Sequence, residues 1–182
     1  MRLLATIALP VASATAATLA LTEAAARFAP GQVPDMAAPA LQADRILVDK
    51  SDRLLVLFRN GQELARYSVS LGSGAEAGPK QVEGDGRTPE GIYRIDARNA
   101  KSRYHLSLRV SYPSGDDRAR AAAMGKSAGG DIMIHGMPNG WVWAAALFQG
   151  RDWTKGCIAV TNTEMRRLWA QVPDGTLIEI RA

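Results

Sequence analysis

The chain has 182 residues, which suits one domain of ordinary size, and its 47% hydrophobic and 22% charged residues are typical of a globular protein. Its net charge of +4 comes from scattered lysines and arginines, without a basic run or a basic stripe interleaved with aromatics, so nucleic acid is not an expected partner. Cys157 is the one cysteine and there are two histidines, too few for an internal disulfide or for the usual structural zinc site. We therefore expect no metal site and no cofactor.

The first 26 residues predict export. A short basic start, Met1-Arg2, precedes a stretch of apolar and small residues that carries no charge before Glu23. Such a segment is typical of a signal peptide, and an uncleaved anchor in the inner membrane is the alternative. Residues 27–42 are rich in proline and alanine and are interpreted as a linker. We expect a folded domain at residues 43–182, located in the periplasm or cell envelope.

Short strands dominate the pattern of this domain. Asn60-Gly61, between two strand-like runs, predicts a tight hairpin. The expected strands are Arg45–Val48, Arg53–Arg59, Glu63–Leu71, Ile92–Ala97, Leu106–Val110, Ile132–His135 and Thr176–Arg181.

Helices are few. One is expected at Asp116–Met124, closed by Gly125, and another at Glu164–Val172, where Thr161 and Glu164 fit a capping box. The segment Trp141–Phe148 is either a short helix or a covering loop. Together these elements predict a mainly β, sandwich-like domain with two or three short helices.

Cys157 is a candidate nucleophile. Gly156 before it permits an unusual turn that leaves the sulfur open to approach, and amides at such a turn can bind an oxyanion. Lys155 adds a positive charge that would favour the thiolate. The alternative is a small, inert cysteine buried in the core.

His135 is a candidate general base. It ends the apolar run Ile132–Ile134 and precedes Gly136, at a strand end where a pocket can form. Its unperturbed pKa of about 6.5 suits proton transfer at neutral pH. A purely structural histidine is the alternative. A Cys-His pair activates sulfur without being adjacent in sequence, so His135 and Cys157 together predict nucleophilic catalysis.

These motifs resemble those of a known family. His135-Gly136, followed downstream by Thr154–Ile158, resembles the signature of the L,D-transpeptidase catalytic domain, the YkuD-type family. The segment Gly86–Gly91 is similar to the family's Gly-x-Thr-Pro-x-Gly loop, and the resemblance covers about residues 43–181. Ala159, where cross-linking members commonly carry Arg or Asn, and a long stretch between the histidine and the cysteine look like the YafK-like branch.

The resemblance implies the mainly β L,D-transpeptidase fold and acyl transfer on peptidoglycan stem peptides through a thioester. Cys157 would be the nucleophile and His135 the base. Gly156 and Cys157 would supply backbone donors to the oxyanion, and a carbonyl at Gly136 would orient the histidine.

Four residues are expected to bind substrate. Thr154 matches the hydroxyl position of the motif, where it would also shape the turn, and Arg87 would bind a peptide carboxylate. Trp153 and Tyr112 would line the cleft. Other aromatic or titratable residues, Tyr104, Trp141 and Trp143, are candidates for the cleft or a lid, while His105 is expected to be structural.

Three functions stay open at this point. An amine acceptor would make the protein a transpeptidase acting on peptidoglycan. Water would make it an amidase or peptidase that cleaves peptidoglycan peptides or links between the wall and a protein. An inert Cys157 would leave a non-catalytic cell-wall-binding module.

Overall fold

The computed structural model describes residues 33–141, 145–148 and 150–182. The predicted signal or anchor at residues 1–26 and the first part of the linker lie outside the described residues, and so does Trp143. Residues Asp35–Ala182 form one compact unit. Within the described ranges, no helix has the length and apolar character that crossing a membrane requires.

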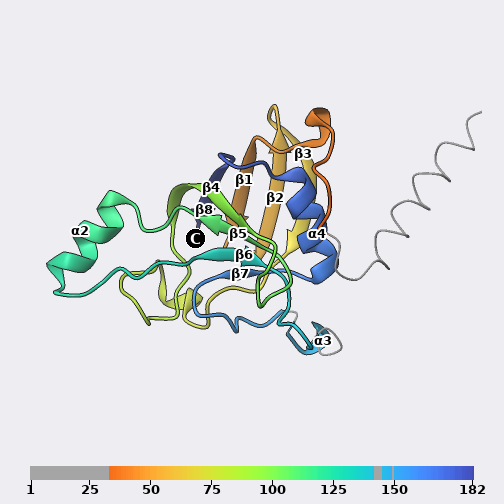
Figure 1. The fold of residues 1–182 in the computed structure, drawn as a ribbon. Helices are drawn as coiled ribbons and strands as arrows, with labels where there is room; N and C mark the ends of the chain where they lie inside the picture. Colours follow the sequence, from red (N-terminus) through yellow and green to blue (C-terminus); the bar gives the residue numbers. More distant parts are fainter. Residues whose placement is uncertain (1–32, 142–144, 149) are drawn as a thin grey trace, which may run out of the picture. The chain divides into compact units, whose positions relative to one another are not determined.

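Eight strands form one curved sheet in the order β3-β2-β1-β8-β4-β5-β6-β7 (Figure 1). The pairs β1–β8 and β6–β7 are parallel and the other neighbours are antiparallel. The strands are β1 (Arg45–Asp49), β2 (Leu54–Arg59), β3 (Gln62–Ser68), β4 (Gly91–Asn99), β5 (Ser107–Val110), β6 (Met133–His135), β7 (Ile158–Ala159) and β8 (Leu177–Arg181). The predicted mainly β fold class is confirmed.

Local sequence explains the first hairpin. Asn60 and Gly61 join β2 to β3 with φ values of +50° and +78°. A type I′ turn requires positive φ at both central residues, which Asn and Gly tolerate best. The predicted hairpin is therefore confirmed.

The segment predicted as one strand at Glu63–Leu71 is divided between two partners. β3 pairs with β2 only as far as Ser68. Ser70 then forms an isolated antiparallel bridge with Ala159 of β7, through hydrogen bonds of 2.9 and 2.8 Å in the two directions. The chain thus runs from one end of the sheet to the other, which brings the residues after β3 beside β7.

Three α-helices lie in the described residues: α2 (Gly115–Ala123), α3 (Ala145–Phe148) and α4 (Asn162–Gln171). α4 begins with the predicted capping box, in which Thr161 Oγ1 accepts from the Glu164 amide and the Glu164 carboxylate accepts from the Thr161 amide. α2 has a second capping box, Ser114 with Asp117. The sequence pattern did not predict this capping box, because aspartate replaces the usual Glu or Gln.

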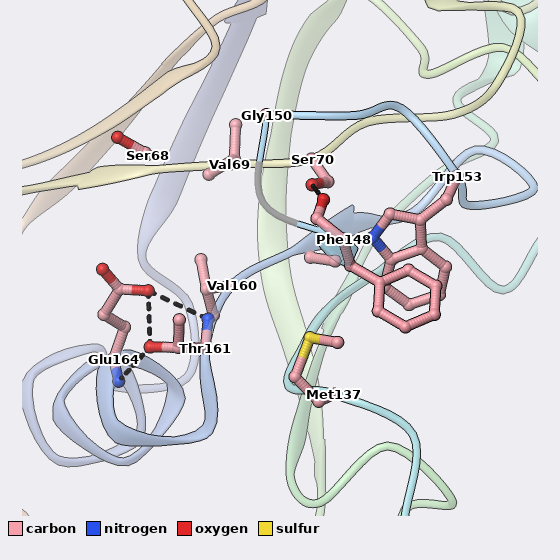
Figure 2. A pocket seen from close by; sticks show the side chains of 11 residues that line it. Ser68, Val69, Ser70, Met137, Phe148, Gly150, Trp153, Val160, Thr161 and Glu164 are labelled. Carbon is pink, nitrogen blue, oxygen red and sulfur yellow. Dashed lines mark hydrogen bonds between the residues drawn. The ribbon is translucent and has the colours of Figure 1, made fainter. Parts of the chain in front are cut away.

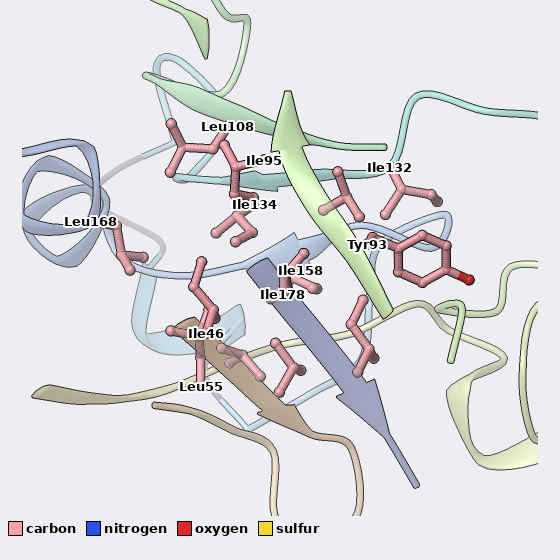
Figure 3. Close-up of a cluster of buried hydrophobic side chains, with 14 of the residues drawn as sticks. Ile46, Leu55, Tyr93, Ile95, Leu108, Ile132, Ile134, Ile158, Leu168 and Ile178 are labelled. Carbon is pink, nitrogen blue, oxygen red and sulfur yellow. The ribbon is translucent and has the colours of Figure 1, made fainter. Parts of the chain in front are cut away.

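The hydrophobic core lies between α4 and the inner face of the curved sheet (Figure 3). Leu168 of α4 packs in the same cluster as Ile134 of β6 and Ile158 of β7, which face each other across the parallel pair. Side chains alternate between the two faces of a strand, so the residues next to these isoleucines point away from the core. Those residues carry the candidate chemistry.

The capping box of α4 gives a stability prediction. Thr161→Ala removes the side-chain acceptor for the Glu164 amide, so we expect the free energy of unfolding to fall by about 1 kcal/mol. Thr163→Ala, an exposed change in the first turn of the same helix, should stay within about 0.5 kcal/mol of the parent. Urea unfolding of the two variants measures the difference, and equal midpoints would contradict the capping role.

Candidate active site

The turn that carries Cys157 is held by one hydroxyl group. Thr154 is 4% exposed, and its Oγ1 donates to the Cys157 carbonyl oxygen at 2.7 Å. The same Oγ1 accepts from the Gly156 amide at 3.1 Å. Thr154 therefore shapes the turn, as the sequence suggested. Its hydroxyl donates one bond and accepts one within the turn, so substrate contact by Thr154 stays a prediction.

Gly156 is required by its surroundings. Its φ of +124° lies in the region that favours glycine, and a Cβ there would lie 2.6 Å from the Arg87 carbonyl oxygen. Gly72 is equally enclosed, with the Gly86 carbonyl and the Gly156 backbone against the place of its missing Cβ. The segments at Gly72, at Gly86-Arg87 and at Gly156 thus contact one another through backbone atoms alone. This close contact restricts the backbone position of Cys157.

The amides of the turn differ from the expected oxyanion site. The Gly156 N–H is bonded to Thr154 Oγ1, so the expectation that it donates to an oxyanion is corrected. In the part of the chain that the structure describes, no acceptor is bonded to the Cys157 N–H. Of the two amides expected to bind the oxyanion, the Cys157 amide therefore remains available as a donor in the described structure.

His135 is oriented by its own neighbour. Its ring is 4% exposed, and Nδ1 lies 2.7 Å from the Gly136 carbonyl oxygen. A carbonyl oxygen only accepts, so Nδ1 carries the hydrogen and Nε2 is the acceptor. The rings of Tyr104 and Trp153 pack against the imidazole, with centroids at 4.5 and 5.8 Å.

The strand register brings Cys157 close to His135. His135 of β6 is opposite Ala159 of β7, and Cys157 lies two residues before Ala159. Cys157 comes directly before β7, and its Sγ contacts the Asp131 carbonyl and the Met133 amide, which precede His135 along the β6 segment. The spacings of a sheet place their Cα atoms about 8 Å apart, within reach of the two side chains.

Burial sets the protonation of both groups. It lowers the pKa of His135, with the bond to the Gly136 carbonyl acting in the opposite direction. It raises the pKa of Cys157; the Met133 amide and Lys80 lower that pKa, and Asp131 raises it further. The net shift of the Cys157 pKa is thus upward, whereas the exposed Lys155 was expected to favour the thiolate. The resting pair is a thiol and a neutral imidazole.

A cavity of about 420 Å³ adjoins this site (Figure 2). Trp153 forms one wall and also contacts the His135 ring, and Ala159 forms part of the floor. The lining residues are Ser68, Val69, Ser70, Met137, Phe148, Gly150, Trp153, Ala159, Val160, Thr161 and Glu164. Cys157 and His135 are not among the lining residues, and the cavity meets the candidate pair through Trp153, which contacts the His135 ring.

The other expected substrate residues fall in different places. Arg87 is half-buried beside the turn, and its guanidinium donates to the Pro79 carbonyl at 3.5 Å. Tyr112 is in the core, where it packs edge-on against Tyr93 and donates to the Ala128 carbonyl. Its expected place in the cleft is corrected, because the strand pattern alone did not show which face it occupies.

Two more aromatic or titratable candidates can be placed. Trp141 is 53% exposed. His105 has a φ of +68°, and its Nε2 is buried without a hydrogen-bond partner in the described residues. Burial lowers the pKa of His105, and Arg166 lowers it further. A Cβ on Gly136 would lie 3.1 Å from the His105 Cβ, so His105 lies beside the His135-Gly136 step.

Sequence reasoning missed two charged residues near the thiol. The Asp131 carbonyl oxygen lies 3.5 Å from Cys157 Sγ, and its position directly before the apolar run of β6 is the signal that could have found it. Lys80 lies in a loop that is far from Cys157 in the sequence, and no motif around Lys80 predicts that it lies near the thiol. Among the described residues, no cluster of three His, Cys, Asp or Glu side chains is placed to hold a metal ion.

The sequence profile of the L,D-transpeptidase catalytic domain (YkuD) matches residues 43–180. Over 97 residues the chain is 34% identical to "Putative L,D-transpeptidase YafK" of Escherichia coli K12, covering 50% of this chain and 37% of that protein.

Solved structures resemble the fold. The helical cell shape determining protein Pgp2 from Campylobacter jejuni matches with a TM-score of 0.58 and 24% identity, over 76% of this chain and 47% of Pgp2. Bd1075 from Bdellovibrio bacteriovorus matches with a TM-score of 0.55 and 26% identity, over 83% of this chain and 52% of Bd1075. The chain thus spans about half the length of these relatives, or less. With three quarters of its length matched by the family profile, the chain belongs to the L,D-transpeptidase catalytic domain family.

Proposed function

We propose that this protein transfers acyl groups on peptidoglycan stem peptides through a thioester on Cys157. Family membership supports a transpeptidase-type function on peptidoglycan. The observation that carries the proposal is the position of Cys157 directly before β7 and against the β6 segment that ends in His135, with the imidazole oriented by the Gly136 carbonyl. This arrangement suits a nucleophile and its general base.

The proposed reaction begins with a neutral pair. His135 Nε2 takes the proton of the Cys157 thiol as Sγ attacks the peptide carbonyl carbon. The Cys157 N–H donates to the oxyanion that forms. The intermediate then collapses, the leaving amine takes the proton from His135, and the acyl group stays on sulfur as a thioester. An amine of a second stem peptide attacks the thioester and restores the thiol.

Hydrolysis is the second candidate for the last step. It is favoured by Ala159, which lines the cavity beside His135 with a methyl group and so offers no polar contact to hold an acceptor peptide. Water attacking the same thioester would release a trimmed peptide or a wall-linked protein. Both reactions need the N-terminal segment to deliver the domain to the periplasm or cell envelope, by export or with the segment kept as an inner-membrane anchor.

The two reactive groups give the first activity prediction. Cys157→Ala and His135→Asn should each lower turnover roughly 10³-fold or more, because such groups act as a unit. His105→Gln, a matched change in the other histidine, should keep most of the activity. The full chain and its variants are incubated with purified sacculi, and the digested muropeptides are analysed by mass spectrometry.

The products of that experiment separate the functions. New cross-links or exchanged terminal residues that depend on Cys157 support the transpeptidase. Trimmed peptides or released wall protein, again dependent on Cys157, support the hydrolase. If the parent chain binds sacculi but leaves them unchanged, both enzymatic functions are contradicted and the non-catalytic binding module is the better interpretation.

The pH profile gives a second activity prediction. A protonated imidazole cannot accept the thiol proton, so kcat/KM should fall in acid. Because the pKa of His135 is lowered from 6.5, the midpoint of that fall should lie below pH 6.5. Initial rates of muropeptide conversion between pH 4 and 10 test this.

The alternative outcome is a rate that climbs toward alkaline pH. Burial raises the pKa of Cys157 above 9.0, so a profile that follows thiol ionisation would mean the thiolate must form without His135. In His135→Asn, any residual activity should follow this alkaline profile.

A further inference from the structure

Lys80 is a buried lysine whose charge is matched by one carboxylate. It is 4% exposed, and its Nζ donates to Asp85 Oδ1 at 2.8 Å and to the Val82 carbonyl at 3.0 Å. The Asp85 side chain is itself largely buried. Lysine is almost never this buried unless it is paired, and two charges that share such a site hold a defined geometry.

Asp85 organises the loop around the pair. Its carboxylate also accepts from the backbone amides of Gln81, Val82 and Arg87. Burial alone would raise the pKa of Asp85, but the hydrogen bonds from Lys80 and these amides lower it to about 2. The carboxylate that holds Lys80 is therefore ionised at any pH where the protein works.

The loop of residues 78–88, called here the Lys80 loop, packs on the nucleophile turn. The Lys80 amide donates to the Thr88 carbonyl, and Thr88 Oγ1 accepts from the Gly72 amide at 2.9 Å. The Arg87 carbonyl oxygen lies directly against Gly156, where a Cβ would be only 2.6 Å from it. The conformation of the Lys80 loop, which Lys80 and Asp85 stabilise, thus positions Gly156, the residue before Cys157.

Charged and titratable groups approach the Cys157 thiol from several segments. They are His135 on β6, Asp131 before β6, Lys155 in the turn itself, and Lys80 and Arg87 in the Lys80 loop. Asp131 and Lys155 are exposed, and the Arg87 guanidinium is turned to Pro79. Lys80 is therefore the cation of this group that solvent screens least.

We propose that Lys80 is a positioning residue for the nucleophile: held by Asp85, it keeps the Lys80 loop against Gly156 and stabilises the negative charge that develops on Cys157 Sγ. The inference rests on the proposed role of Cys157 as nucleophile. Lys80 would act by positioning the turn that carries Cys157 and by the electrostatic effect of its charge, without contacting substrate.

Alkylation of the single cysteine by iodoacetamide tests the inference directly on the full chain. Lys80→Met keeps the length of the side chain and removes its charge. We expect the pH midpoint of alkylation to rise by about one unit, so that the reaction at pH 7.5 is roughly tenfold slower. In the sacculus assay, kcat should fall while KM is unchanged.

Two further variants make the test specific. Lys80→Met with Asp85→Asn leaves no unpaired buried charge, so it protects folding, and its midpoint should rise in the same direction by a smaller amount. Lys50→Met is the matched control. Lys50 is an equally buried lysine that bonds to Glu90 at 2.5 Å and to the Gly78 carbonyl at 3.3 Å, at the ends of the same loop.

The outcomes separate this inference from the proposed function. A shift in both Lys80 variants with an unchanged Lys50→Met supports it. An unchanged midpoint in the double variant, or an equal shift in Lys50→Met, overturns it, since loop packing alone would then explain the data. Alkylation needs no wall substrate, so inactivity of the parent chain on sacculi would count against the proposed function and not against the shift.

Discussion

The close approach of three backbone segments at Gly156 is the constraint on which the site depends. The Arg87 carbonyl, Gly72 and Gly156 leave no room for a side chain, and the φ of Gly156 adds a second reason for glycine. The Thr154 hydroxyl then ties the two ends of the turn together. The backbone at Cys157 cannot move without displacing a neighbouring loop. The position of the nucleophile is thus set by main chain, which is stiffer than any arrangement of side chains.

Burial gives the pair its resting state. A neutral imidazole beside an un-ionised thiol costs less in a desolvated site than a separated pair of charges. In the proposed reaction, charge develops only as Sγ attacks a carbonyl group. The electrostatic environment of the sulfur therefore matters most in the transition state. The thiol form is also the less easily oxidised form of cysteine.

The sequence predicted those parts of the fold that depend on near neighbours. Asn60-Gly61 and the Thr161–Glu164 capping box are complete within a few residues, and both are present. β7 escaped notice because its two residues owe their strand conformation to β6 and Ser70, which are distant in sequence. The use of the Gly156 amide by Thr154, the core position of Tyr112 and the burial of Lys80 depend on tertiary packing in the same way. The signature therefore pointed to Cys157 and His135 as the candidate pair, while the groups that act on their pKa values became visible only in three dimensions.

The chain between the two reactive residues is tied down at both ends. On the His135 side, the Gly136 amide donates to the Tyr104 carbonyl and the Met137 amide to Asn162 Oδ1. On the Cys157 side, Asp152 accepts from the Leu71 amide and the Thr154 amide donates to the Leu71 carbonyl. The segment is also held in between, where the Asn139 side chain donates to the Ser102 carbonyl and the Phe148 carbonyl accepts from Ser70 Oγ. Its backbone is thus anchored on both sides of the pair, so side-chain exchanges along it can alter what the cavity contacts while the backbone around His135 and Cys157 keeps its place.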